Sequence, residues 1–272
     1  MNCKKMNCKK TLCASLMLLA GLGAAAQADN ISITVENTMA SDSFFFTPVW
    51  MAAHDGSFNT YDTGTMASDW SGLTELAEGG DTSLVSARFA AMNPGGVDAT
   101  LAAVAGMGDA PVFSPGESAH MTLDVGDASV NRFFSFASMI VPSNDLFMGN
   151  DDPMSYELFD ASGNFNGPLT IEIYGGDVND AGTEVNDAFG GAAFSTNGGM
   201  SQDEAVNIRA FFTDSGDEAY LDSFLGSMTG NGSTIGSTFG SDDLIARITI
   251  VPAPASLSLL GLGGLGLIRR RR

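Results

Sequence analysis

The sequence predicts an all-β protein folded as an antiparallel β-sandwich, and three observations support this fold class. Short segments in which apolar and polar residues alternate recur between residues 31 and 250. Clusters of Gly, Asn, Asp and Ser separate these segments, as turns separate strands. Helical periodicity is scarce, and its best candidate is Ser71–Glu78. Many short, half-buried strands joined by turns favour two sheets packed face to face.

Five strands are predicted in chain order. Four of them alternate strictly between apolar and polar residues: 31–36, 121–125, 169–173 and 246–250. Alternation with a period of two is typical of a strand that buries one face. The fifth segment, Phe133–Val141, is almost continuously apolar and is expected to be a central strand.

The N-terminal segment differs from the rest of the chain. Met1–Lys10 carries four lysines, residues 12–26 are apolar, and Ala26-Gln27-Ala28 has the small-x-small pattern of a cleavage site. These features are typical of a secretory signal peptide, and the apolar run is shorter than the ~20 residues of a membrane span. We therefore expect residues 1–28 to be removed. All three cysteines lie there, so the mature chain is expected to have no disulfide and no thiolate site.

Residues 29–251 form the predicted folded domain, long enough for one sizeable core. All 32 Asp and Glu residues of the chain lie in this segment, together with only four arginines, so its formal charge is about −28. Such a surface repels phosphate backbones, which excludes nucleic acid as a partner. It attracts divalent cations, whose hard-cation sites need carboxylates. Solubility of an exported domain is the alternative reason for the acidity.

Residues 252–272 are predicted to be a sorting tail. Val251-Pro252-Ala253-Pro254 ends the last predicted strand, because proline cannot donate to a ladder. The hydrophobic run Leu257–Ile268 follows, and four arginines, which favour the cytoplasmic side of a membrane, close the chain. Even residues 251–268 would span only about 27 Å as a helix. The run therefore suits a transient anchor, with an ordinary C-terminal membrane anchor as the alternative.

This order of proline motif, short hydrophobic helix and arginine cluster resembles the PEP-CTERM sorting signal of Gram-negative, exopolysaccharide-producing bacteria. The resemblance covers Val251–Arg272. It implies processing near the proline motif by an exosortase-type enzyme, after which an inner-membrane-anchored intermediate passes to the cell surface or extracellular matrix. Ala253 stands where that family usually has glutamate, which leaves the cognate enzyme and the effect on sorting open.

Acidic residues follow two of the predicted strands. Asp145 comes just after the central strand, and the 169–173 strand leads into a loop in which Asp180 and Glu184 flank an Ala-Gly-Thr turn. If the two strands are neighbours, all three carboxylates converge, and they repel one another unless a cation lies between them. The loop is not an EF-hand, because Ala181 and Ala188 replace ligands of that motif. Solvated acidic loops are the alternative.

Two motifs carry a family resemblance. Val141-Pro142-Ser143-Asn144-Asp145 and Asp180-Ala181-Gly182-Thr183-Glu184 resemble those of the spondin N-terminal domain, and the similarity extends over residues 31–251. It implies a C2-like β-sandwich that binds one Ca²⁺ through three acidic side chains, which correspond here to Asp145, Asp180 and Glu184. Three positions depart from the family pattern: Asn144 replaces a proline, Leu146 an aromatic residue and Glu184 an aspartate.

No enzyme motif is present in the sequence: G-x-S-x-G, H-E-x-x-H and a phosphate loop are all missing. His54, in a glycine-containing turn, is expected to make a structural hydrogen bond, and His120 is expected at the surface or an edge. Phe44–Phe46 and Trp50 could stack on a sugar ring, but core packing is the better interpretation.

The prediction is therefore a non-enzymatic, exported, calcium-binding module for adhesion or matrix binding, with an extracellular glycan or matrix protein as partner. Two other classes stay open. A glycan-active enzyme would need a carboxylate pair in a cleft, one of the two with a raised pKa. A passive structural component of the matrix would need no discrete ligand.

Overall fold

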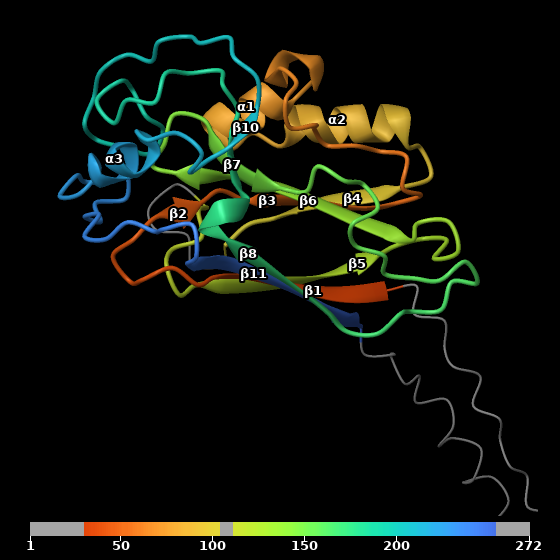
Figure 1. The fold of residues 1–272 in the computed structure, drawn as a ribbon. Coiled ribbons are helices and arrows are strands. Elements are labelled where there is room, and N and C mark those ends of the chain that lie inside the picture. Colours follow the sequence, from red (N-terminus) through yellow and green to blue (C-terminus); the bar gives the residue numbers. More distant parts are fainter. Residues whose placement is uncertain (1–29, 104–110, 254–272) are drawn as a thin grey trace, which may run out of the picture.

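The computed structural model describes residues 30–103 and 111–253 (Figure 1). Two antiparallel sheets pack face to face, and helices cover the outer face of the larger sheet. The predicted all-β sandwich is confirmed. Within these residues no helix is long and apolar enough to cross a bilayer. The predicted signal peptide and residues 254–272 of the predicted tail lie outside the described part of the chain.

The smaller sheet contains the four strands that were predicted from strict alternation. They are β1 (Asn30–Asn37), β5 (Ser118–Asp124), β8 (Leu169–Tyr174) and β11 (Leu244–Pro252), in the order β5-β1-β11-β8. One face of this sheet packs on the core and the other faces solvent, which is the environment that alternation indicates. Ile31, Ile33 and Val35 are fully buried on β1, while the residues between them are partly exposed.

The larger sheet has strand order β10-β9-β7-β6-β3-β4, and β2 also pairs with β6. Its members are β2 (Phe45–Phe46), β3 (Val49–His54), β4 (Val97–Leu101), β6 (Phe133–Val141), β7 (Leu146–Gly149), β9 (Val178–Asp180) and β10 (Arg209–Ala210). The apolar segment predicted as a central strand is β6, which lies between β7 and β3. Sheet partners on both sides and packing on both faces bury every residue of β6 except the partly exposed Phe133.

Three α-helices and two 3₁₀ turns complete the described part. They are η1 (Ala67–Asp69), α1 (Leu73–Gly79), α2 (Ser83–Met92), η2 (Gly175–Asp177) and α3 (Asp217–Asp222). Only α1 was predicted. Helix α2 buries Val85 and Phe89 but exposes Leu84 and Met92, so its apolar residues form no single stripe. Helix α3 is too short to show helical periodicity.

Apolar side chains fill two layers. One core lies between the sheets and includes Phe44 and Phe46. The other lies between the larger sheet and the helices, where Trp50 contacts the rings of Phe58 and Phe89, each with ring centroids 5.7 Å from it. These aromatic residues are fully buried, so they pack in the core and are not available to stack on a sugar ring.

The two histidines have different environments. His120 is exposed on β5, an edge strand, as predicted. His54 is fully buried at the end of β3, where Nδ1 accepts a hydrogen bond from the Gly56 amide at 3.0 Å and Nε2 lies 2.9 Å from Ser135 Oγ. Burial lowers the pKa of His54 to about 4. The neutral ring is therefore a structural hydrogen-bonding group.

Protonation of His54 is expected to destabilise the fold in mild acid. Between pH 6.5 and about 4 the unfolded chain holds a proton on this ring that the folded chain does not, so stability falls as pH falls through this window. The expected contribution of His54 to this loss of stability is about 1 kcal/mol between pH 7 and pH 5.5. Denaturant unfolding at both pH values measures this loss of stability. The His54→Gln variant should not show the contribution of His54, while His120→Gln should show it in full. The same pH dependence in all three proteins would contradict this assignment.

Candidate metal centre

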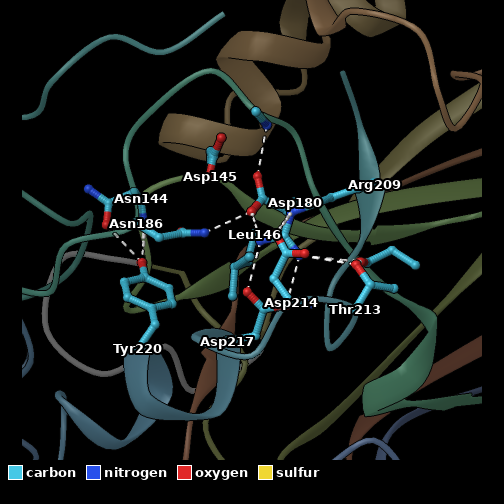
Figure 2. Close-up of polar contacts among 12 residues, drawn as sticks. Asn144, Asp145, Leu146, Asp180, Asn186, Arg209, Thr213, Asp214, Asp217 and Tyr220 are labelled. Carbon is cyan, nitrogen blue, oxygen red and sulfur yellow. Dashed lines mark hydrogen bonds and ion pairs between the residues drawn. The ribbon is translucent and has the colours of Figure 1, made fainter. Parts of the chain in front are cut away.

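Strand register gathers the candidate site at one end of the larger sheet. Leu146, the first residue of β7, pairs with Asp180 at the end of β9, and Asp180 pairs on its other side with Arg209 of β10. Asp145 immediately precedes Leu146. Its side chain therefore lies next to that of Asp180, and Arg209 approaches from the adjacent strand (Figure 2).

The route by which Asp180 reaches Asp145 differs from the predicted one. The strands expected to be neighbours, β6 and β8, belong to different sheets. After β8 the chain crosses at η2 and adds the separate strand β9 beside β7. The crossing passes close to Gly240, whose carbonyl oxygen would collide with a Cβ at Gly175, so only glycine fits there. Asp180 therefore lies near Asp145 through the pairing of β9 with β7, and not through the expected pairing of β6 with β8.

Asp145 is a fully buried carboxylate that is only half satisfied. Its Oδ2 accepts hydrogen bonds from the Thr183 amide at 2.8 Å, the Glu184 amide at 3.1 Å and Thr183 Oγ1 at 3.2 Å. A turn at Gly182, whose φ of 66° is in the left-handed region that glycine adopts readily, directs these groups toward it. The other oxygen, Oδ1, is buried and accepts no hydrogen bond from the part of the chain that the structure describes.

The environment of Asp145 favours the binding of a positive charge. Burial, and then the nearby charge of Asp180, raise the pKa of Asp145 to about 7, although the three hydrogen bonds to Oδ2 act in the opposite direction. A buried carboxylate next to a second one is costly when ionised. A proton or a cation relieves this cost, and near neutral pH the group is poised between the two.

Asp180 is part of a second network centred on Arg209. Its Oδ2 accepts hydrogen bonds from Arg209 Nη2 and Asn186 Nδ2, both at 2.7 Å. The same guanidinium donates to both carboxylate oxygens of Asp217, at 2.7 and 2.8 Å. Asp180 and Asp217 are almost fully buried. Burial alone would raise the pKa of Asp217, but hydrogen bonds from Arg209 and from backbone amides lower it. Arg209 therefore neutralises two buried carboxylates together.

Asn144, at the position where the resemblance described above leads one to expect proline, makes a backbone hydrogen bond. Its backbone amide donates to Tyr220 Oη at 2.9 Å, a bond that a proline could not make. The Tyr220 hydroxyl donates in turn to Asn144 Oδ1 at 2.8 Å, and this atom also accepts the Asp187 amide at 3.1 Å. Asn144 thereby ties the turn before Asp145 to helix α3 (Figure 2).

Glu184 is placed differently from the two aspartates. Its backbone amide donates to Asp145, but its half-buried carboxylate makes no hydrogen bond with Asp145 or Asp180. In residues 30–103 and 111–253, no three side chains of His, Cys, Asp or Glu are grouped so that they could hold a metal ion. The structure thus brings Asp145 and Asp180 together and leaves the Glu184 side chain beside them.

Three residues of this network were not predicted from the sequence: Arg209, Asp217 and Tyr220. The sequence did contain a signal for Arg209. It is one of only four arginines in an acidic domain of 32 carboxylates, where each arginine is an obvious ion-pair partner. A pocket of about 510 Å³ borders the network and is lined by Asp180, Arg209, Asp217 and Tyr220 among others. It gives solvent a route to this end of the sheet.

The sequence matches a known protein family. A model of the family described as Spondin_N matches residues 38–227, which include both motifs and the whole of the Arg209 network. The chain belongs to the Spondin_N family. No curated protein sequence matches the chain. Spondin_N membership assigns it to the exported or extracellular protein domains.

Proposed function

We propose that this Spondin_N chain is a non-enzymatic surface or matrix protein whose domain binds one calcium ion. Asp145 and Asp180 would supply the first carboxylates, and Glu184, on the same turn, the third. The observation that supports this most directly is the Oδ1 atom of Asp145, which is buried and has no hydrogen-bond partner among the described residues. Buried polar atoms are almost always satisfied, so an unpaired carboxylate oxygen is a natural ligand position.

The chemistry of the donors favours calcium over other cations. All of the side chains proposed as ligands are carboxylates, and hard divalent cations prefer oxygen ligands. Calcium accepts six to eight oxygens in flexible geometry and can use backbone carbonyls and water to complete its shell. Magnesium requires a tight octahedron and gives up water reluctantly. An irregular turn with two adjacent carboxylates therefore suits calcium better.

Adhesion to an extracellular glycan or matrix protein is the biological role that we propose for the calcium-bound domain. The motifs lie in loops and short strands at one end of a rigid sandwich, where binding residues are commonly found. Residues 1–28 would direct export. Residues 252–272 would act as a PEP-CTERM-like tail, cut by an exosortase-type enzyme after transient anchoring in the inner membrane.

Calcium should stabilise the folded chain. An ion that binds the native state alone adds about 2.7 kcal/mol when its free concentration is a hundred times the dissociation constant. Asp180→Asn keeps the size of the side chain but removes a charge, so its calcium-dependent shift should shrink or vanish. Thermal unfolding of the full chain in chelator and in millimolar calcium measures both effects.

The matched control is Asp242→Asn, which removes a charge from an exposed residue near the last strand and should keep the full shift. Millimolar magnesium should stabilise the wild-type protein much less than calcium does. An unchanged midpoint for the wild-type chain in chelator and in calcium would remove the metal from this proposal. Equal shifts in the Asp180→Asn and wild-type proteins would place the ion elsewhere.

A further inference from the structure

A second pocket, of about 370 Å³, lies away from the Asp145 carboxylate. We call it the Tyr156 pocket. It is bounded by the end of β7, the crossing from β8 through η2, and strand β9, and its lining includes Phe136, Asp151, Tyr156, Glu172, Asp177 and Asn179. Its volume is in the range that small-molecule sites occupy. It shares no lining residue with the pocket beside Arg209.

The Tyr156 pocket is negatively charged. Three carboxylates line it, and although Glu172 pairs with Arg247 outside the pocket, none of the lining residues themselves is a lysine, arginine or histidine. These negative charges also affect two tyrosines of the lining. Burial first, and then the charge of Asp177, raise the pKa of Tyr156. Burial, followed by the charge of Asp151, also raises the pKa of Tyr61, which lines the same pocket. An anionic ligand would be repelled here.

Several of the donors that line the pocket are already used within the protein. Tyr61 uses its hydroxyl to donate to the Gly149 carbonyl, and Asn150 uses its amide nitrogen for Ser135 Oγ and the Asp152 carbonyl. Asn179 is only 7% exposed, and its amide nitrogen donates to Tyr61 Oη at 2.9 Å. Its Oδ1 accepts no hydrogen bond from the described residues. A donor on a ligand would match this oxygen.

We propose that the Tyr156 pocket binds a primary ammonium group on an unbranched alkyl stem. The ammonium has three donors and a positive charge, which match Asn179 Oδ1 and the carboxylates of Asp151 and Asp177. The rings of Tyr156 and Phe136, with centroids 6.2 Å apart, offer a surface for the stem and for cation–π contact. The proposal is independent of the calcium site.

Other ligand classes fit this pocket less well. A metal ion needs clustered ligands, and among the described residues the acidic side chains do not form a group of three that could hold one. A glycosidase needs a carboxyl group with a raised pKa, but the described carboxyl groups whose pKa is raised, Asp145 and Glu78, do not line this pocket. An organic cation can contact acceptors that lie farther apart than the ligands of a metal ion.

Binding to the full chain can be measured by calorimetry with three probes, each in chelator and in calcium. The probes are 1,5-diaminopentane, a short lysine-containing peptide with blocked ends, and the same peptide with its lysine acetylated. Diaminopentane and the lysine peptide should both bind, with or without calcium, and the acetylated peptide should not. If the lysine peptide binds more tightly than diaminopentane, the ammonium group comes from a protein. If diaminopentane binds more tightly, it comes from a small molecule.

Variants locate the binding. Asp177→Asn can still accept the Tyr174 amide, and Asp151→Asn can still accept Thr63 Oγ1, so both should fold. Each should weaken binding of the lysine peptide about tenfold, as the loss of one charge-assisted hydrogen bond predicts. Asp124→Asn, on β5 at the opposite edge of the smaller sheet from β8, should leave it unchanged. Equal weakening by Asp124→Asn, or equal binding of the acetylated peptide, would overturn the proposal.

Discussion

Replacing Arg209 with methionine is expected to destabilise the fold by about 3–5 kcal/mol. Methionine keeps an apolar stem of similar length against Phe211 but leaves Asp180 and Asp217 without their shared counter-charge. Both carboxylates are almost fully buried, and an uncompensated buried charge costs far more than a surface ion pair contributes. Denaturant-induced unfolding of the full chain measures the loss.

Arg247→Met is the matched control. Arg247 pairs with Glu36 and Glu172 on the solvent face of the smaller sheet, where all three side chains are partly exposed. Exposed pairs contribute about 0–1 kcal/mol, so this variant should stay close to the wild type. Adding Asp217→Asn to Arg209→Met should recover part of the loss, because one of the two buried charges is then removed. Equal losses in Arg209→Met and Arg247→Met would show that the Arg209 network is not buried in solution.

Trp50→Ala is expected to cost a similar amount, about 3–5 kcal/mol. The indole is fully buried between the larger sheet and the helices, and its removal leaves a cavity against Phe58 and Phe89. It also removes the hydrogen bond that Trp50 Nε1 donates to Asp98 Oδ2 at 2.9 Å. Unfolding in denaturant, monitored by circular dichroism, measures the change.

Trp50→Phe separates the two contributions, since it fills most of the cavity and removes only the hydrogen bond to Asp98; we expect a smaller loss. Phe189→Ala deletes an aromatic ring that is 61% exposed and should change stability by less than about 0.5 kcal/mol. If Trp50→Ala cost no more than Phe189→Ala, the layer between the larger sheet and the helices would not be a packed core.

The sequence predicted the smaller sheet better than the larger one, for a physical reason. Strands β1, β5, β8 and β11 each bury one face, and this environment leaves a period of two in the sequence. Strands β9 and β10 have three and two residues, too few for any period to appear. Helix α2 lacks an apolar stripe, so its sequence carries no helical period from which it could be predicted.

The candidate site was predictable in part. Asp145 and Asp180 lie in recognisable motifs, and each follows or ends a strand in the larger sheet. Arg209 lies almost thirty residues beyond Asp180 in the chain, within a stretch of turns that carries no periodic pattern. Its role depends on the pairing of β9 with β10, a long-range contact that local sequence does not encode.

The position of β11 determines how the domain bears tension. This strand begins near η2, ends at Pro252, and is hydrogen-bonded along its length to β1 on one side and β8 on the other. Figure 1 shows α3, which contacts the turn before Asp145, at the opposite end of the sandwich from the point where the described chain leaves β11. If the proposed adhesion ligand were bound at that far end and the proposed tail held the chain beyond Pro252, a pull between them would run parallel to β11 and load both ladders in shear. Inter-strand hydrogen bonds lie perpendicular to such a force and must fail together rather than one by one.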